Sequence, residues 1–595
     1  MTFTTRPEIK GTFGVVTTTH WLASAVGMKL LEEGGNAFDA AVAAGLVLSV
    51  VEPHLNGPLG DLPILAWRAG EEVPQVICAQ GVAPAGLTIA HCRREGLDHI
   101  PGAGLLATVV PGAFDGWMQL LRDWGTRPLR DVLAPALHYA EAGHPLLPRV
   151  AATIEGQAAF FRAEWPSSAA TWLPRDEAPA PWSLFRNPDL AATWRRLLAE
   201  AEGARGREAG IQAARTAFYR GFVAETIGDW LAGAELADAT GTRRRGVLSA
   251  DDMAAWSATV EPAVAGGYRD WTLWKTGPWG QGPALLQALG ILEAVGLDGV
   301  DLEGPDFVHL VIEALKLALA DREAFYGDPE GAEIPLAALL SRDHGAERAA
   351  LIGQRASREQ RPSVLPGYEA WAEAAVGRAA RVAAAAGPGA GEPTMAHLAR
   401  RPGDTVHLDV IDRWGNMVSA TPSGGWLQSS PVVPGLGMAL NTRAQMFWLE
   451  EGLASSLAPG RRPRTTLSPS MARGPDGTRL AFGTPGGDQQ DQWQLVFFLR
   501  HVHGMRDLQR AIDAPLFHTQ HMQSSFDPRV ARPGHLMVEP GLGEATIGAL
   551  TARGHEVEVA APWSVGRLTA AARDPDGLLR AAATPRLMQA YATGR

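Results

Sequence analysis

The stretch PGDTVHLDVIDRWGNMVSAT, residues 402–421, has the pattern of a β-hairpin that opens on a threonine. Apolar and polar residues alternate over 407–411 and again over 417–421, which is the period of a strand with one buried face. The five residues between them, DRWGN, supply the glycine and asparagine that suit a tight turn. We therefore predict two antiparallel strands here, with Thr405 at the start of the first.

Thr405 could act as a nucleophile if the peptide bond before it were cut. The hydroxyl and a free α-amine would then belong to one residue, so the nucleophile would carry its own base. An α-amine titrates near about pH 8, so a useful fraction is neutral at physiological pH and accepts the hydroxyl proton. The alternative is structural, because a β-branched threonine suits the first position of a strand.

Residues 370–392, upstream of this threonine, form an Ala- and Gly-rich segment with Gly and Pro at its end. This composition predicts a mobile linker or a frayed helix, and the alternative is an ordinary Ala-rich surface helix. Residues 20–51 have helical spacing that is broken at Gly34-Gly35-Asn36, so we predict two helices there, the second buried on all sides. Further helices are expected at 284–294, 307–325 and about 491–503, and strands at 64–67, 75–79 and 479–482.

Composition excludes several classes of function. The 595 residues include 53 Lys and Arg against 64 Asp and Glu, a net charge of −11, so we expect no nucleic-acid partner and no membrane surface. Cys78 and Cys92 are too few for a disulfide framework or a Cys-rich zinc site. The chain has no Walker loop, HExxH or dinucleotide-binding glycine motif, so we predict no metal and no cofactor. Without an export signal, the expected compartment is the cytoplasm.

Motifs at both ends and in the middle of the chain occur in one order: Leu22-Ala23-Ser24, residues 34–41 (GGNAFDAA), Val51-Glu52-Pro53-His54, Val110-Pro111-Gly112, Ala320-Asp321-Arg322-Glu323, Gly327-Asp328-Pro329, Asp404-Thr405-Val406-His407, Val432-Val433-Pro434-Gly435, residues 462–469 (RPRTTLSP) and Pro485-Gly486-Gly487. With these motifs the chain resembles the gamma-glutamyltransferase family of N-terminal nucleophile hydrolases, as a divergent member. The resemblance implies an α+β fold, a four-layer αββα sandwich made from a self-cleaving precursor.

By this resemblance the precursor is cut between Asp404 and Thr405. Residues 1–404 would form a large subunit and residues 405–595 a small subunit, and the two would share one composite domain as a heterodimer, with further dimerisation open. Thr405 would be the nucleophile, and the amides of Gly486 and Gly487 would form the oxyanion hole. Thr421 and Ser423 match hydroxyl positions that flank the nucleophile, although polar residues at a strand edge are the alternative.

The sequence departs from the family where substrate is bound. The family's transpeptidases hold the α-carboxylate of the γ-glutamyl group with an arginine, and Gln80 stands at that position. The acidic pair that takes the substrate α-amine is missing from residues 441–447, NTRAQMF, and Thr465 and Thr466 replace a pair of serines. Glutathione is therefore not the expected substrate.

Arg443 and Arg464 remain as cations that could hold a carboxylate on the acyl group, and each could equally be a surface cation or a structural ion pair. The expected substrate is a small amide whose acyl part bears a carboxylate. Two alternatives stay open. The chain could be a true gamma-glutamyl transferase or glutathione hydrolase in which other residues bind the γ-glutamyl carboxylate and amine, or it could be a non-catalytic binding protein.

Overall fold

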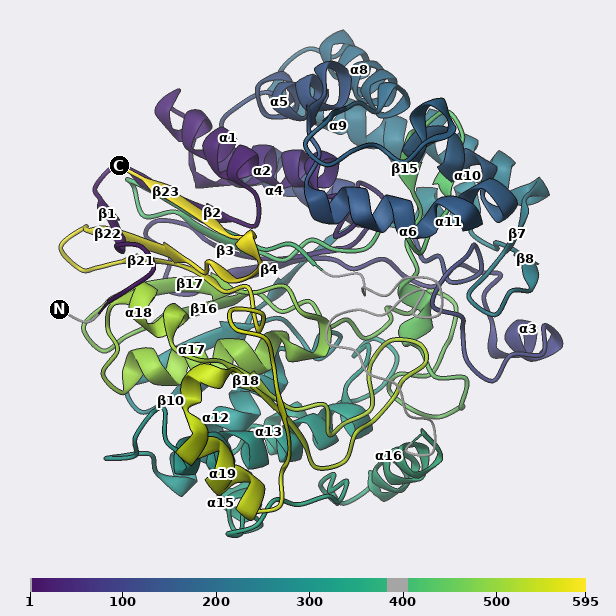
Figure 1. The fold of residues 1–595 in the computed structure, drawn as a ribbon. Helices are drawn as coiled ribbons and strands as arrows, with labels where there is room; N and C mark the ends of the chain where they lie inside the picture. Colours follow the sequence, from purple (N-terminus) through teal and green to yellow (C-terminus); the bar gives the residue numbers. More distant parts are fainter. Residues whose placement is uncertain (1–2, 383–404) are drawn as a thin grey trace.

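Two seven-stranded antiparallel sheets lie face to face, with helices covering both outer surfaces (Figure 1). The computed structural model describes residues 3–382 and 405–595. The first sheet has the order β23 (Tyr591–Gly594), β2 (Gly14–Thr18), β12 (Leu408–Asp412), β13 (Met417–Ala420), β3 (Leu62–Trp67), β4 (Gln75–Ala79) and β9 (Thr259–Pro262). The second has the order β1 (Ile9–Gly11), β22 (Leu579–Ala583), β21 (Thr569–Arg573), β17 (Arg479–Gly483), β16 (Ser470–Arg473), β11 (Trp271–Lys275) and β10 (Val264–Tyr268).

One helical layer packs on the first sheet through α1 (Trp21–Glu32), α2 (Ala37–Val51) and α4 (Ala113–Trp124). Farther out or toward the side of this layer lie α5 (Leu129–Ala142), α6 (Pro148–Glu164), α8 (Pro188–Gly203), α9 (Arg207–Tyr219), α10 (Phe222–Gly233) and α11 (Ala250–Ala255) (Figure 1). Helix α7 (Pro166–Trp172) follows α6 and packs against it. The other layer packs on the second sheet through α12 (Pro283–Val295), α17 (Gln490–Val502) and α18 (Leu508–Asp513). Beyond them lie α13 (Pro305–Phe325), α15 (Arg342–Ala349), α16 (Glu369–Val382) and α19 (Glu544–Ala552). The four-layer αββα sandwich is thereby confirmed.

The shorter elements include α3 (Ile89–Arg94), α14 (Leu336–Leu339), and the small sheets β5 (His144–Pro145) with β6 (Leu184–Phe185), β7 (Glu235–Ala237) with β8 (Arg243–Arg245), β14 (Val432–Val433) with β15 (Met438–Ala439), and β18 (Phe517–His518), β19 (His535–Val538) and β20 (Glu556–Val559). No helix within the described ranges is both long and apolar enough to cross a membrane.

The start of α2 shows how local sequence sets the helical layer. Gly34 adopts φ +88° after α1, a conformation that glycine tolerates, and Asn36 then caps α2 by accepting hydrogen bonds from the amides of Phe38 and Asp39. Asp39 completes a capping box by accepting the Asn36 amide at 2.9 Å. All residues of α2 are buried, so the prediction of two helices with a buried second one is confirmed.

Strand β12 follows the predicted alternation, and its two faces have different neighbours. Val406, Leu408 and Val410 belong to the apolar core beneath the helices, whereas Ile411 lies in the core between the two sheets. The polar residues of this segment share the second face, because successive side chains of a strand point to opposite sides. The space between the sheets therefore turns from apolar to polar toward Thr405.

The Ala-rich segment is not a linker over its first part. Residues 369–382 form the helix α16, which packs against α13 and buries Ala372, Ala375 and Ala379. Alanine has the highest helix propensity, and its small side chain allows close packing, so the helical alternative holds here. Residues 383–392 lie outside the described chain.

Candidate active site

Thr405 and Ser423 are cross-strand neighbours at the open end of the β12–β13 hairpin. The register that pairs Leu408 with Ala420 places Thr405 opposite Ser423. Thr405 Oγ1 lies 3.2 Å from Ser423 Oγ, and both residues are fully buried. The structure thus brings together the predicted nucleophile and one of the two hydroxyls predicted to flank it.

The next pair along the hairpin is His407 opposite Thr421, with His407 Nδ1 2.8 Å from Thr421 Oγ1. The other ring nitrogen, Nε2, lies 3.0 Å from Asp409 Oδ1. Both nitrogens of this buried imidazole are therefore held by side chains of the hairpin. The predicted residue Thr421 contacts His407, which the sequence analysis did not single out.

Asp409 receives hydrogen bonds from both sheets. The Ser419 hydroxyl donates to Oδ1 at 2.9 Å, and His407 Nε2 lies 3.0 Å from the same oxygen. The hydroxyls of Thr17 in β2 and Thr569 in β21 donate to Oδ2, at 3.1 Å and 2.9 Å. Asp409 thus joins strands of both sheets through its carboxylate. Asp409 was also missed, although the repeat of polar residues at 405, 407 and 409 in an otherwise apolar strand is a signal that could have found it.

The glycine loop that follows β17 carries the two residues predicted to form the oxyanion hole. Gly486 and Gly487 have φ angles of +140° and +56°. The Gly486 carbonyl accepts from the Gln489 amide at 3.0 Å, and the Gly487 carbonyl accepts from Gln281 Nε2 at 3.1 Å. Because C=O and N–H point in opposite directions across a trans peptide, the bond to the Gly486 carbonyl directs the Gly487 N–H away from Gln489. Of the two amides predicted as oxyanion donors, these contacts orient that of Gly487. A Cβ on Gly486 would lie 2.2 Å from Trp493.

Asp61 connects Ser423 to the predicted substrate residues. It exchanges two backbone hydrogen bonds with Ser423, at 2.9 and 3.0 Å, and its carboxylate accepts from Arg443 Nε at 2.9 Å and from the Thr465 hydroxyl. Burial raises the pKa of the Asp61 carboxyl, and Arg443 opposes this by favouring the charged form. The Arg443 guanidinium also lies over the Trp426 ring at 4.7 Å. Asp61 is a third residue that sequence reasoning missed.

Arg464 lies instead in a buried network of ion pairs. Its Nη1 is 2.8 Å from Glu323 Oε1, and its Nη2 donates to Ser525 Oγ at 2.8 Å. Arg322 also pairs with Glu323, at 2.8 Å, and with Asp488, at 2.7 Å. Burial alone would raise the pKa of Glu323, but the guanidinium groups of Arg464 and Arg322 outweigh it and lower the pKa to about 2. Arg464 thus takes part in a structural ion pair, the alternative to a role in binding the substrate carboxylate.

Gln80 lies one residue beyond Ala79, which pairs with Leu62, so Gln80 comes opposite Asp61 at the end of β4. Its side chain is buried and borders a cavity of about 560 Å³ that Arg462 and Trp256 also line. Both amide atoms of Gln80 are without a hydrogen-bond partner among the described residues. Thr466, next to Thr465, is buried as well.

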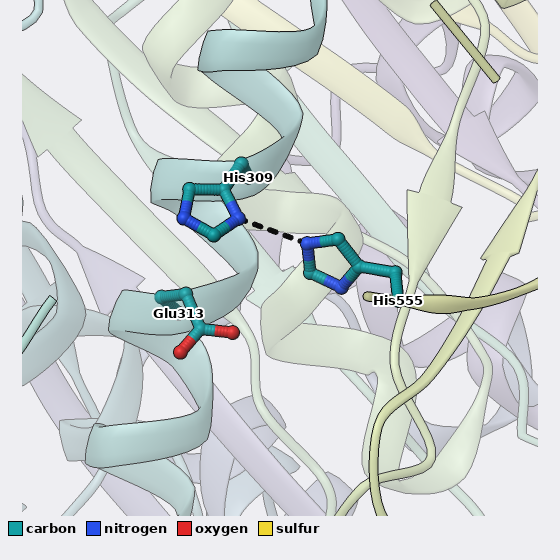
Figure 2. Close-up of side chains that lie close together, drawn as sticks. All are labelled: His309, Glu313 and His555. Atoms are coloured by element: carbon teal, nitrogen blue, oxygen red, sulfur yellow. Dashed lines mark hydrogen bonds between the residues drawn. The ribbon is translucent and has the colours of Figure 1, made fainter. Parts of the chain in front are cut away.

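One group in the described chain has the composition of a metal site: His309, Glu313 and His555 (Figure 2). His309 Nδ1 lies 2.9 Å from His555 Nε2, and His309 Nε2 lies 2.8 Å from the Gly353 carbonyl. Glu313 accepts from Lys316 Nζ at 2.7 Å, and a second cation, Arg361, lies 3.3 Å from it. The carboxylate is thus already balanced by two cations, which disfavours a third positive charge, and the cluster supports no metal assignment.

Comparison with known proteins adds to this geometry. The gamma-glutamyltranspeptidase family profile matches residues 23–594. The Acylase ACY 1 proenzyme of Pseudomonas sp. (strain SE83) is 32% identical over 96% of this chain and 92% of its own length. The oxamate amidohydrolase proenzyme of Klebsiella pneumoniae subsp. pneumoniae is 31% identical over 97% of both chains. Among solved structures, cephalosporin acylase from Bacillus halodurans aligns with a TM-score of 0.79 at 27% identity, over 99% of this chain and 97% of that one. The structure of LmbA2991HD aligns with a TM-score of 0.91 at 52% identity, over 100% of both.

Proposed function

Because the chain belongs to the gamma-glutamyltranspeptidase family, we propose that it is an amidohydrolase whose nucleophile is Thr405, exposed by self-cleavage after Asp404. The observation that carries this proposal is the contact between Thr405 Oγ1 and Ser423 Oγ at the polar end of the space between the sheets. Two relatives that span nearly the whole chain, the acylase and the oxamate amidohydrolase, are named as proenzymes, which supports a precursor here.

Self-cleavage needs only groups of this chain and one water. Thr405 Oγ1 attacks the carbonyl carbon of Asp404, the C–N bond breaks as the nitrogen takes a proton, and an ester joins the two residues. Water then hydrolyses the ester, leaving a carboxylate on residue 404 and a free α-amine on Thr405. The two products stay together as a heterodimer, since strands from both sides of the cut pair with each other in both sheets.

In turnover, the α-amine of Thr405 takes the hydroxyl proton as Oγ1 attacks the amide carbon of the substrate. The N–H groups at Gly486 and Gly487 receive the developing oxyanion. The proton passes to the leaving amine, the C–N bond breaks, and the acyl group remains as an ester on Thr405. Water releases the acid and restores the hydroxyl, so no cofactor enters the balance.

The proposed substrate is a small amide whose acyl part carries a carboxylate but not the full γ-glutamyl zwitterion. Gln80 is neutral and stands opposite Asp61, where a γ-glutamyl carboxylate would need a cation. Gln445 is not acidic, and its side-chain nitrogen donates to the Thr442 carbonyl at 3.0 Å. Arg443, tied through Asp61 to Ser423, is the cation we assign to the substrate carboxylate, while Arg464 is held by Glu323.

Intact mass spectrometry tests the nucleophile. We expect two chains, the smaller beginning at Thr405, and a single uncut chain for Thr405→Ala. A folded, active sample that contains only the full-length chain would overturn the assignment.

An amide panel tests the substrate class and separates the alternatives. We expect hydrolysis of oxamate or of a carboxylate-bearing acyl amide of the cephalosporin type, and little turnover of γ-glutamyl-p-nitroanilide with or without glycylglycine. Efficient γ-glutamyl turnover would favour a remodelled transferase or glutathione hydrolase. A correctly cut protein that is inactive on the whole panel would favour a binding role.

A further inference from the structure

The imidazole of His407 separates the strand that bears Thr405 from the strand that leads to the glycine loop. Gly483, the last residue of β17, faces this ring so closely that a Cβ on it would lie 2.2 Å from His407 Cε1 and 2.6 Å from Nδ1. Gly483 has no positive φ angle, so glycine is required there by the ring and not by its backbone conformation. The two strands belong to different sheets, and the ring fills the gap between them.

Contacts at both ring nitrogens orient the ring within this gap. Asp409 accepts hydrogen bonds on both oxygens, so the ring nitrogen that faces it, Nε2, carries a hydrogen. In the neutral imidazole this leaves Nδ1 to accept the Thr421 hydroxyl at 2.8 Å. One side chain of its own strand and one of the neighbouring strand thus fix the ring plane against Gly483.

His407 is close in sequence to the predicted nucleophile, and Gly483 is close in sequence to the glycine loop. Thr405 lies two residues before His407, and Gly486 lies three residues after Gly483. The distance between Thr405 and the glycine loop therefore depends on the His407 ring, which lies between β12 and β17. Resting on the function proposed above, we infer that His407 is a positioning residue that holds Thr405 at the working distance from Gly486 and Gly487, with Asp409 and Thr421 fixing its orientation.

The test uses self-cleavage of the full-length chain, which needs no added substrate. Wild type, His407→Asn, Gly483→Ala and the double variant are synthesised in a cell-free system, and the first-order rate of cleavage is followed by gel electrophoresis. His407→Asn removes the ring and lets the strands approach, whereas Gly483→Ala forces them apart. A displacement of about 1 Å costs on the order of 100-fold in rate, so each single variant is expected to cleave about 10- to 100-fold more slowly.

The double variant is the decisive measurement. Its alanine methyl takes space that the ring has vacated, so we expect it to cleave at least about tenfold faster than His407→Asn alone, which independent effects would not produce. Matched controls are Gly548→Ala, where a Cβ meets nothing within 4 Å, and His138→Asn on an exposed helix face. Both controls should cleave at the wild-type rate.

Other outcomes overturn the inference. Additive losses in the double variant would show no spacing role, and a wild-type rate in either single variant would do the same. If His407→Asn shifts the pH dependence of cleavage, His407 is a proton acceptor and not a spacer. Should His407→Asn not fold by circular dichroism, Gly483→Ala decides by its rate. Cleavage of Thr405→Ala would instead overturn the proposed function itself.

Discussion

Replacing Arg464 by methionine should weaken the fold and leave substrate binding unchanged. Arg464 is 2% exposed, contacts Glu323 at 2.8 Å, and donates to Ser525 at 2.8 Å. Removing one partner of a buried ion pair costs about 3 to 5 kcal/mol, because the other charge is left without compensation. Glu323 keeps Arg322 at 2.8 Å and Gln523 at 3.1 Å, so we place the loss of unfolding free energy near the lower end, about 3 kcal/mol.

Urea unfolding at one fixed protein concentration, followed by circular dichroism, measures this loss. The double variant Arg464→Met with Glu323→Gln removes both charges and should recover at least about 1 kcal/mol of it. Arg443→Met is the matched comparison: it should raise KM on the best amide of the panel, whereas Arg464→Met should leave KM within about twofold. An unchanged unfolding midpoint with a KM raised more than about tenfold for Arg464→Met would refute this reasoning and restore Arg464 as a substrate ligand.

Three further predictions concern the same buried groups. The pKa of Glu323, about 2, lies below its usual 4.5, so ionised Glu323 stabilises the fold by roughly 3 kcal/mol above about pH 4.5, and this contribution is lost as the pH falls toward 2. In Glu323→Gln the urea midpoint should therefore fall less steeply between pH 4.5 and 2 than in wild type. The same pH dependence of the midpoint in both proteins would contradict this. Gly486→Ala places a Cβ 2.2 Å from Trp493 at φ +140°, so self-cleavage should fall about 100-fold or more, and near-normal cleavage on gels would exclude an oxyanion role. Asp61→Asn leaves Arg443 without its carboxylate, so unfolding free energy should drop by about 3 kcal/mol and turnover should fall; a stable, fully active variant would exclude Asp61 from the site.

The sequence was sufficient where local pattern determines structure. Asn36 and Gly34 mark the boundary between α1 and α2, and the alternation after Thr405 fixes both the hairpin and the face that Thr405 occupies. Once the register of a hairpin is set, the partner of each residue follows, which is why Ser423 next to Thr405 could be expected.

The remaining features depend on packing between distant segments. The role of Asp409 needs Thr569 from the other sheet, and Arg464 is neutralised by Glu323 from α13, which no local spacing indicates. Asp61 stands in a loop rich in glycine and proline and gains its importance only through the bridge to Ser423. The sequence predicts that position 80 departs from the family's arginine, but it could not place Gln80 opposite Asp61.

The pairing of strands from before and after residue 404 within both sheets has a thermodynamic consequence. In the uncut chain, β12 returns to β2 and β13 to β3 as intramolecular events, so the folded fraction is independent of protein concentration. After cleavage the same strand pairings join two molecules, and unfolding becomes a dissociation governed by mass action. Dilution would then favour the unfolded state, and refolding of the cut protein would require an encounter between two chains. A single hydrolysed peptide bond would thus make the stability of this fold depend on protein concentration.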